Sequence, residues 1–82
     1  MKNKKIWAVI TVARQIEGEY IFIKTEKAFE QASKAQALMD KLKKQYTAPD
    51  GKQKPVEIET EQGGALCRCT VGAFNLEVES DE

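Results

Sequence analysis

A run of apolar residues with helical spacing between Thr25 and Tyr46 restricts the fold of this chain more than any other feature. At about 100° per residue, one narrow sector of this segment collects small and apolar side chains, with Phe29 and Leu38 on its flanks. The members of the sector are Ala28, Ala32, Ala35, Met39, Leu42 and Tyr46. The opposite sector is mostly charged, Thr25 is a suitable N-cap, and a Pro-Asp-Gly run at 49–51 follows. The sequence therefore predicts one long amphipathic helix over residues 25–46.

The segments around the helix have the alternation of β-strands. Apolar and β-branched residues dominate 6–13 and 19–24, and the polar connection 14–18 between them ends in Gly, which predicts a hairpin. Val56 and Ile58 alternate with glutamates, which predicts a strand with one buried face. Gly63 and Gly64 then turn the chain toward a last strand.

The last strand changes phase. Its apolar residues are odd-numbered from Ala65 to Val71 but even-numbered from Phe74 to Val78, with Gly72 and Ala73 between. A slip of one residue moves every later side chain to the other face unless a bulge or a turn absorbs it. We expect one long bulged strand, and a separate short fifth strand is the alternative.

These elements give an α+β fold of two layers, with element order ββαββ. We expect an antiparallel sheet with the helix packed on one face. Residues 1–79 form a single domain, long enough to hold a core without a disulfide or a structural metal, and residues 80–82 form a frayed acidic tail.

Charge is balanced overall but not along the chain. Lys and Arg total 13, as do Asp and Glu. Residues 1–54 hold 12 basic and 6 acidic residues, a net charge of +6, whereas residues 55–82 hold 1 basic and 7 acidic residues, a net charge of −6. The zero net charge lacks the basic excess of duplex-binding proteins. The uneven distribution of charge along the chain predicts a molecule with an acidic C-terminal section.

The first residues admit two interpretations. Lys2, Lys4 and Lys5 precede the apolar run 6–13, as in a secretory signal, but this run is at the short end for such a signal and five of its eight residues are β-branched. We therefore favour a buried strand. No segment approaches the ~20 apolar residues needed to cross a membrane, so we expect no membrane association. Two cysteines without a disulfide framework favour a cytoplasmic protein.

Materials for catalysis are few. The chain has no His and only two serines, Ser33 and Ser80, so a hydrolytic triad cannot be assembled. Alternating glutamates on strands normally face solvent rather than an apolar pocket, and the Gly63-Gly64 pair lacks the Lys and Ser/Thr of a phosphate loop. We predict a protein that is not an enzyme, with no catalytic residues and no cofactor.

Cys67 and Cys69 could offer two thiolates to a soft metal. They share a strand face with Ala65 and Val71, however, and free cysteine behaves as a small apolar residue. We favour a core position and predict no metal site. Arg68 points the opposite way, where it could lie between acidic neighbours.

One face of the sheet remains without a helix. If Ile6, Ala8, Ile10 and Val12 face the helix, then Trp7 and Val9 lie on the uncovered face. Tyr20 and Phe22 would join them, although the opposite phase of their strand stays open. Loops or the tail could instead cover these rings.

Two functions follow from that face. The first is a protein-interaction or regulatory module with a partner protein, self-association included, because aromatic centres with charged borders are typical of interfaces. The second is a single-strand nucleic-acid binder that uses the aromatic rings and the basic Lys2, Lys4 and Lys5 arm. Glutamates near the face would repel phosphates, which favours the first. The candidate interaction surface consists of Trp7, Val9, Tyr20, Phe22, Glu57, Glu59 and Arg68.

Overall fold

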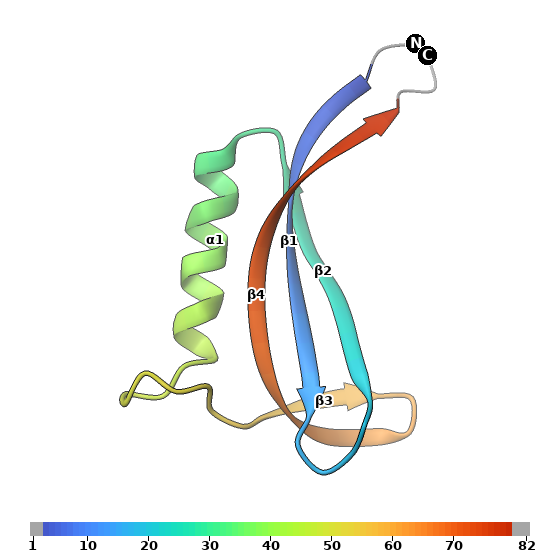
Figure 1. The fold of residues 1–82 in the computed structure, drawn as a ribbon, viewed down its shortest axis with the longest axis vertical. Helices are drawn as coiled ribbons and strands as arrows, with labels where there is room; N and C mark the ends of the chain where they lie inside the picture. The colour runs from blue at the N-terminus through green and yellow to red at the C-terminus, as the bar shows by residue number, and fades with distance from the viewer. Residues whose placement is uncertain (1–2, 80–82) are drawn as a thin grey trace.

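A computed structural model describes residues 3–79 as one antiparallel four-stranded sheet and one helix, which confirms the α+β class. The elements in chain order are β1 (Asn3–Gln15), β2 (Ile21–Phe29), α1 (Ala32–Gln45), β3 (Val56–Thr60) and β4 (Gly63–Glu79). The strand order is β2-β1-β4-β3, and α1 lies along one face of the sheet (Figure 1). The frayed tail expected at 80–82, and Lys2 of the basic arm, lie outside the described residues.

The first and last strands form the centre of the sheet. They pair without interruption from Asn3 opposite Glu79 to Gln15 opposite Cys67. The bulge predicted near Gly72 is therefore wrong, since the residues from 63 to 79 form one regular strand. Gly72 has another role: a Cβ there would come within 2.9 Å of the Phe74 ring, so the missing side chain leaves room for that ring.

The helix is shorter than its periodicity predicts. Residues 25–29 belong to β2, where Phe29 pairs with Trp7, and α1 begins only at Ala32. Thr25 is consequently not the N-cap, because Gln31 holds that position without a side-chain hydrogen bond. The first N–H groups of a helix have no hydrogen-bond partner within the helix. Pairing with β1 gives such partners to residues 25–29, so the strand extends further than local propensity suggests.

The helix covers the odd-numbered side of β1, which corrects the predicted face assignment. Val9 and Ala35 have no exposed surface, and Val71 completes this buried cluster. Partly buried apolar side chains surround the cluster, and they are Trp7, Phe29, Leu38, Met39, Leu42, Tyr46 and Ala73. Because side chains alternate along a strand, Ile6, Ala8, Ile10 and Val12 lie on the other face.

A second cluster continues the core below the end of α1. Its buried members are Ala13, Cys67 and Cys69, and Tyr46 contacts both clusters. Phe22 packs here as well, so β2 has the phase opposite to the one first considered, and Ile21 and Ile23 are exposed. Both cysteines are free thiols in the core.

No helix among the described residues is long and apolar enough to cross a membrane.

The apolar stripe of α1 should decide stability. We expect Leu42→Asp to unfold the domain, because Leu42 packs against the Val9 cluster and burying an unpaired carboxylate costs several kcal/mol against a total of about 5–10 kcal/mol. Lys41→Asp, at the neighbouring exposed position, is the matched control and should melt like the wild type. Circular dichroism melting curves measure both, and a native melt for Leu42→Asp would place the core elsewhere.

Candidate functional site

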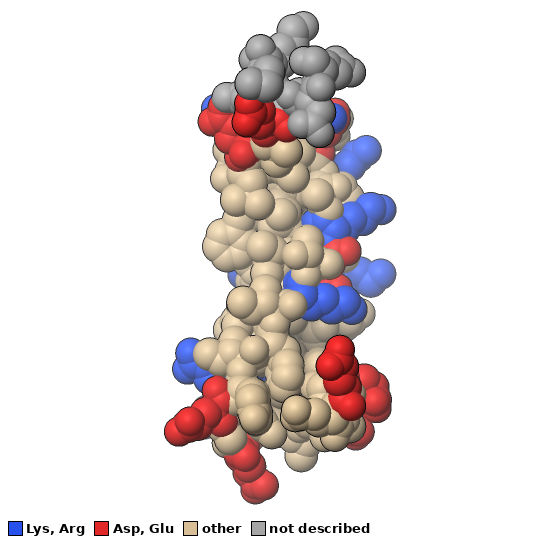
Figure 2. Space-filling model, turned by 90° about the vertical axis from the view of Figure 1, so that its right-hand side faces the viewer, with Lys and Arg blue, Asp and Glu red and all other residues tan. Residues whose placement is uncertain are grey.

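The sheet face opposite α1 carries a long apolar surface, here called the uncovered face. By strand alternation it consists of Ile6, Ile10, Val12, Ile21, Ile23, Leu66, Phe74, Leu76 and Val78. Six of these are large side chains in open solvent, from Leu76 at 43% exposed to Ile23 at 71%. Figure 2 shows uncharged atoms along most of this side of the molecule, with charged groups at the borders and ends.

Two arginines interrupt the apolar surface near the end of β1. Arg14 and Arg68 are direct partners in the β1–β4 ladder, so their side chains leave the same face of the sheet. Both are exposed, and neither has an ion-pair partner within residues 3–79. Glu57 and Glu59 leave the same face of the sheet, because they pair with Leu66 and Gly64 of β4, but no ion pair within the described residues joins either of them to Arg68.

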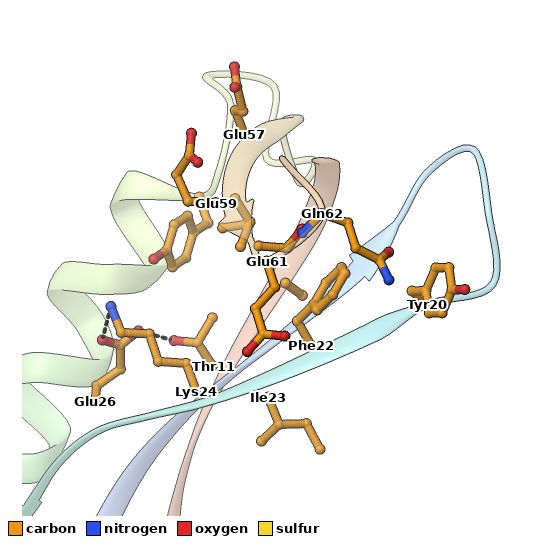
Figure 3. A pocket seen from close by; sticks show the side chains of 14 residues that line it. Thr11, Tyr20, Phe22, Ile23, Lys24, Glu26, Glu57, Glu59, Glu61 and Gln62 are labelled. Carbon is orange, nitrogen blue, oxygen red and sulfur yellow. Dashed lines mark hydrogen bonds and ion pairs between the residues drawn. The ribbon is translucent and has the colours of Figure 1, made fainter. Parts of the chain in front are cut away.

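A cleft of about 960 Å³ opens on the other side of the sheet, beyond the C-terminal end of α1. Residues from β1, β2, α1's end, β3 and the β3–β4 turn line it (Figure 3). Tyr20 and Phe22 stack on one wall, with ring centroids 6.3 Å apart and planes 27° apart. Glu57, Glu59 and Glu61 come from the opposite wall.

A β-bulge places a carboxylate inside this cleft. The β1–β2 register shifts between Val9 and Ile10, which leaves Glu26 as the extra residue of β2. Glu26 accepts a hydrogen bond of 2.7 Å from the Thr11 hydroxyl, and one of its oxygens is 3.4 Å from the Lys24 ammonium nitrogen. Its side chain is only 13% exposed. The bulge thus directs the Glu26 side chain into the cleft.

Burial and the Glu26 carboxylate raise the pKa values of two neighbouring groups. Desolvation raises the pKa of Tyr46, and the negative charge of Glu26 adds to the effect. Desolvation also raises the pKa of the Cys69 thiol, and electrostatic interactions with Cys67 and Glu26 raise it further. Both groups are therefore neutral near pH 7, and Cys69 lacks the thiolate character of a nucleophile.

The structure divides the seven residues of the predicted surface among three places. Trp7 and Val9 pack under α1 and belong to the core, so their assignment to the uncovered face is wrong. Arg68 does lie on the uncovered face. The other four line the cleft, and they are Tyr20, Phe22, Glu57 and Glu59. Phe22 packs on the helix side of the sheet, whereas Glu57 and Glu59 pair with Leu66 and Gly64 and so leave β3 on the side of the uncovered face.

The prediction missed the residues that make up most of both surfaces. Phe74, Leu76 and Val78 were visible as a change of phase, but that change was attributed to a bulge. Glu26 was counted with the helix, and only its pairing with β1 shows that it enters the cleft. Among the described residues, no group of three or more His, Cys, Asp or Glu side chains could hold a metal ion.

No family model, curated protein or solved structure matches this chain. The two surfaces therefore have to be interpreted from their own geometry and chemistry.

The cysteines give a test of the core through pH. Because the folded-state pKa of Cys69 lies above its ordinary value of 9.0, its contribution to stability is present below pH 9 and is lost as the pH rises through the folded-state value. We expect the urea midpoint of the wild type to fall between pH 8 and pH 10.5, and Cys69→Ala to show a smaller fall. Equal pH dependence in the two proteins would contradict the burial of this thiol.

Proposed function

We propose that this chain is a small, non-enzymatic protein-interaction module whose uncovered face packs against the same face of a second copy. The observation that carries the proposal is the exposed apolar surface formed by Phe74, Leu76, Val78 and their neighbours on β1 and β2. Monomeric proteins rarely leave an apolar patch of this extent in water, because its burial is worth roughly 25 cal/mol per Å².

The dimensions of the uncovered face suit a standard interface. It lies on the side of the molecule that measures 46 Å by 15 Å (Figure 2). The whole of this side, charged residues included, is about 700 Å² before side chains add to it, against the ~800 Å² that each partner buries in a typical stable complex. The charged groups at its border correspond to the polar rim of such interfaces.

Charge favours a second copy and indicates how it is oriented. The net charge is zero, so no long-range repulsion opposes association of identical chains. Arg14 and Arg68 lie near one end of the face, where β1 ends. A two-fold axis in the plane of the interface and perpendicular to the strands keeps the two arginine pairs at opposite ends. The alternative with parallel strands would bring four arginines together.

Nucleic-acid binding receives less support than at the sequence level. The hypothesis depended on Trp7, Tyr20 and Phe22 on the uncovered face, but Trp7 packs under α1 and the other two rings stack in the cleft beside glutamates. Phe74 is the aromatic side chain of the uncovered face as defined above, and single-strand binders usually stack several bases.

A single lysine on the uncovered face should abolish the dimer. We expect sedimentation equilibrium to give twice the 9.2 kDa chain mass for the wild type at tens of micromolar. Leu76→Lys should give the mass of one chain, because truncating or charging a central apolar anchor costs an interface about 2 kcal/mol or more. Ala37→Lys, on the exposed surface of α1, adds the same charge and should remain dimeric.

Circular dichroism checks that each variant is folded. A wild type that is monomeric at 100 µM overturns the proposal. A Leu76→Lys protein that stays dimeric rejects the uncovered face as the interface and directs attention to the edge of β4 that β3 leaves unpaired beyond Cys67.

A further inference from the structure

The cleft touches two strands along their edges rather than on their faces. Its lining includes the consecutive residues 22–24 of β2 and 57–62 of β3 and the following turn. Successive side chains of a strand point to opposite faces, so a cavity that contacts every residue in a row must run beside the backbone. The cleft is therefore bordered by strand edges on two sides.

Within residues 3–79, both of these edges are unpaired. β2 and β3 are the outer strands of the sheet, and each pairs on one side only, with β1 and β4 respectively. An outer strand presents unpaired N–H and C=O groups, which is the surface that an extended peptide uses when it adds a strand to a sheet. The curvature of the sheet brings the two edges to opposite walls of one cleft (Figure 3).

From this geometry we propose that the cleft binds an extended, basic segment of a partner protein, which adds a strand to a free edge of the sheet. The site adjoins the uncovered face, with which it shares Ile23 at the edge of β2.

The charges of the cleft select a basic occupant. Glu57, Glu59 and Glu61 are exposed, and no ion pair neutralises them within residues 3–79, whereas Lys24 is already beside Glu26. In Figure 3 the Glu61 side chain points into the cleft toward Phe22, whereas the Glu57 and Glu59 carboxylates point away from Phe22, on the other side of β3, where they would meet alternate side chains of a strand added to the β3 edge. An acidic wall attracts lysine or arginine side chains and repels acidic segments, including β3 of another copy.

The remaining lining suits the stems of such side chains. Tyr20 and Phe22 present stacked aromatic faces, which attract cations and pack against aliphatic chains. The volume of about 960 Å³ leaves room for several side chains of a peptide. Charged residues on an outer strand also discourage unwanted pairing between copies, and the same property restricts the edge to partners of opposite charge.

The test uses a fluorescein-labelled seven-residue peptide of alternating lysine and valine, titrated with the full chain and followed by fluorescence anisotropy. We expect saturable binding that weakens as salt rises from 50 to about 500 mM, because exposed charges are screened. An acidic peptide of alternating glutamate and valine should not bind. A lack of binding by the basic peptide overturns the proposal.

Two matched variants locate the site. Glu61→Lys, in the β3–β4 turn, should weaken binding about tenfold or more. Glu17→Lys makes the same charge change in the β1–β2 connection, outside the cleft, and should change binding less than threefold. Equal effects of the two variants would assign binding to the overall charge and not to the cleft.

Backbone methylation tests strand addition itself. Residues of an added strand bond to the sheet at alternate positions, so N-methylation of alternate amides in one phase should abolish binding and in the other phase should leave it unchanged. Equal tolerance of both phases rejects strand addition. Spermidine that displaces the peptide at a concentration similar to the unlabelled peptide's would mean that a free polyamine, not a peptide, is the ligand.

The dimer variant separates this inference from the proposed function. Leu76→Lys changes the uncovered face and should bind the peptide as the wild type does. If the wild type has the mass of two chains and Glu61→Lys has the mass of one, the cleft is occupied by a second copy and the proposed partner is wrong.

Discussion

The unbroken register between β1 and β4 is the constraint on which the rest of the structure depends. From Asn3 opposite Glu79 to Gln15 opposite Cys67, odd-numbered residues face odd-numbered ones and even-numbered residues face even-numbered ones. The two long strands therefore sort their side chains together: Val9 and Val71 go under α1, and Ile6 and Leu76 go to the bare side. A bulge in β4 would have turned half of that strand over and mixed the two populations.

The sequence alone predicted the α+β class, but not where the helix begins or which side of each strand meets it. The apolar stripe from Ala35 to Tyr46 correctly marks the side of α1 that packs on the sheet. In β1, however, Trp7 and Val9 on one side are as apolar as Ile6 and Ile10 on the other, so alternation cannot say which side meets the helix. Only the pairing with β4 decides it, and that pairing joins residues at least 52 positions apart. Thr25 and Glu26 were likewise predicted to be helical, because a local sequence pattern contains no information about their pairing with β1.

The position of the cleft could not be predicted from single strands either. Tyr20, Phe22, Glu57 and Glu59 were grouped from their chemistry, and they do line one cleft, but Phe22 lies on the helix side while Glu57 and Glu59 leave β3 on the other side. The sheet curves so that its outer strands become the walls of one cleft, and a bulge directs Glu26 between them. Curvature and bulges arise from the whole sheet, so a strand-by-strand interpretation cannot supply them.

The central pairing of the first strand with the last also determines how the domain responds to tension. The outermost pair, Asn3 with Glu79, is the one nearest both ends of the described chain. Strands in an antiparallel pair are joined by hydrogen bonds perpendicular to their length. A force that separates the two ends therefore loads one rung of the ladder at a time, beginning with this pair, and peels β4 away from β1. Such a domain opens at low force, in the manner of a zipper, and releases α1 only after the rungs beneath it have parted.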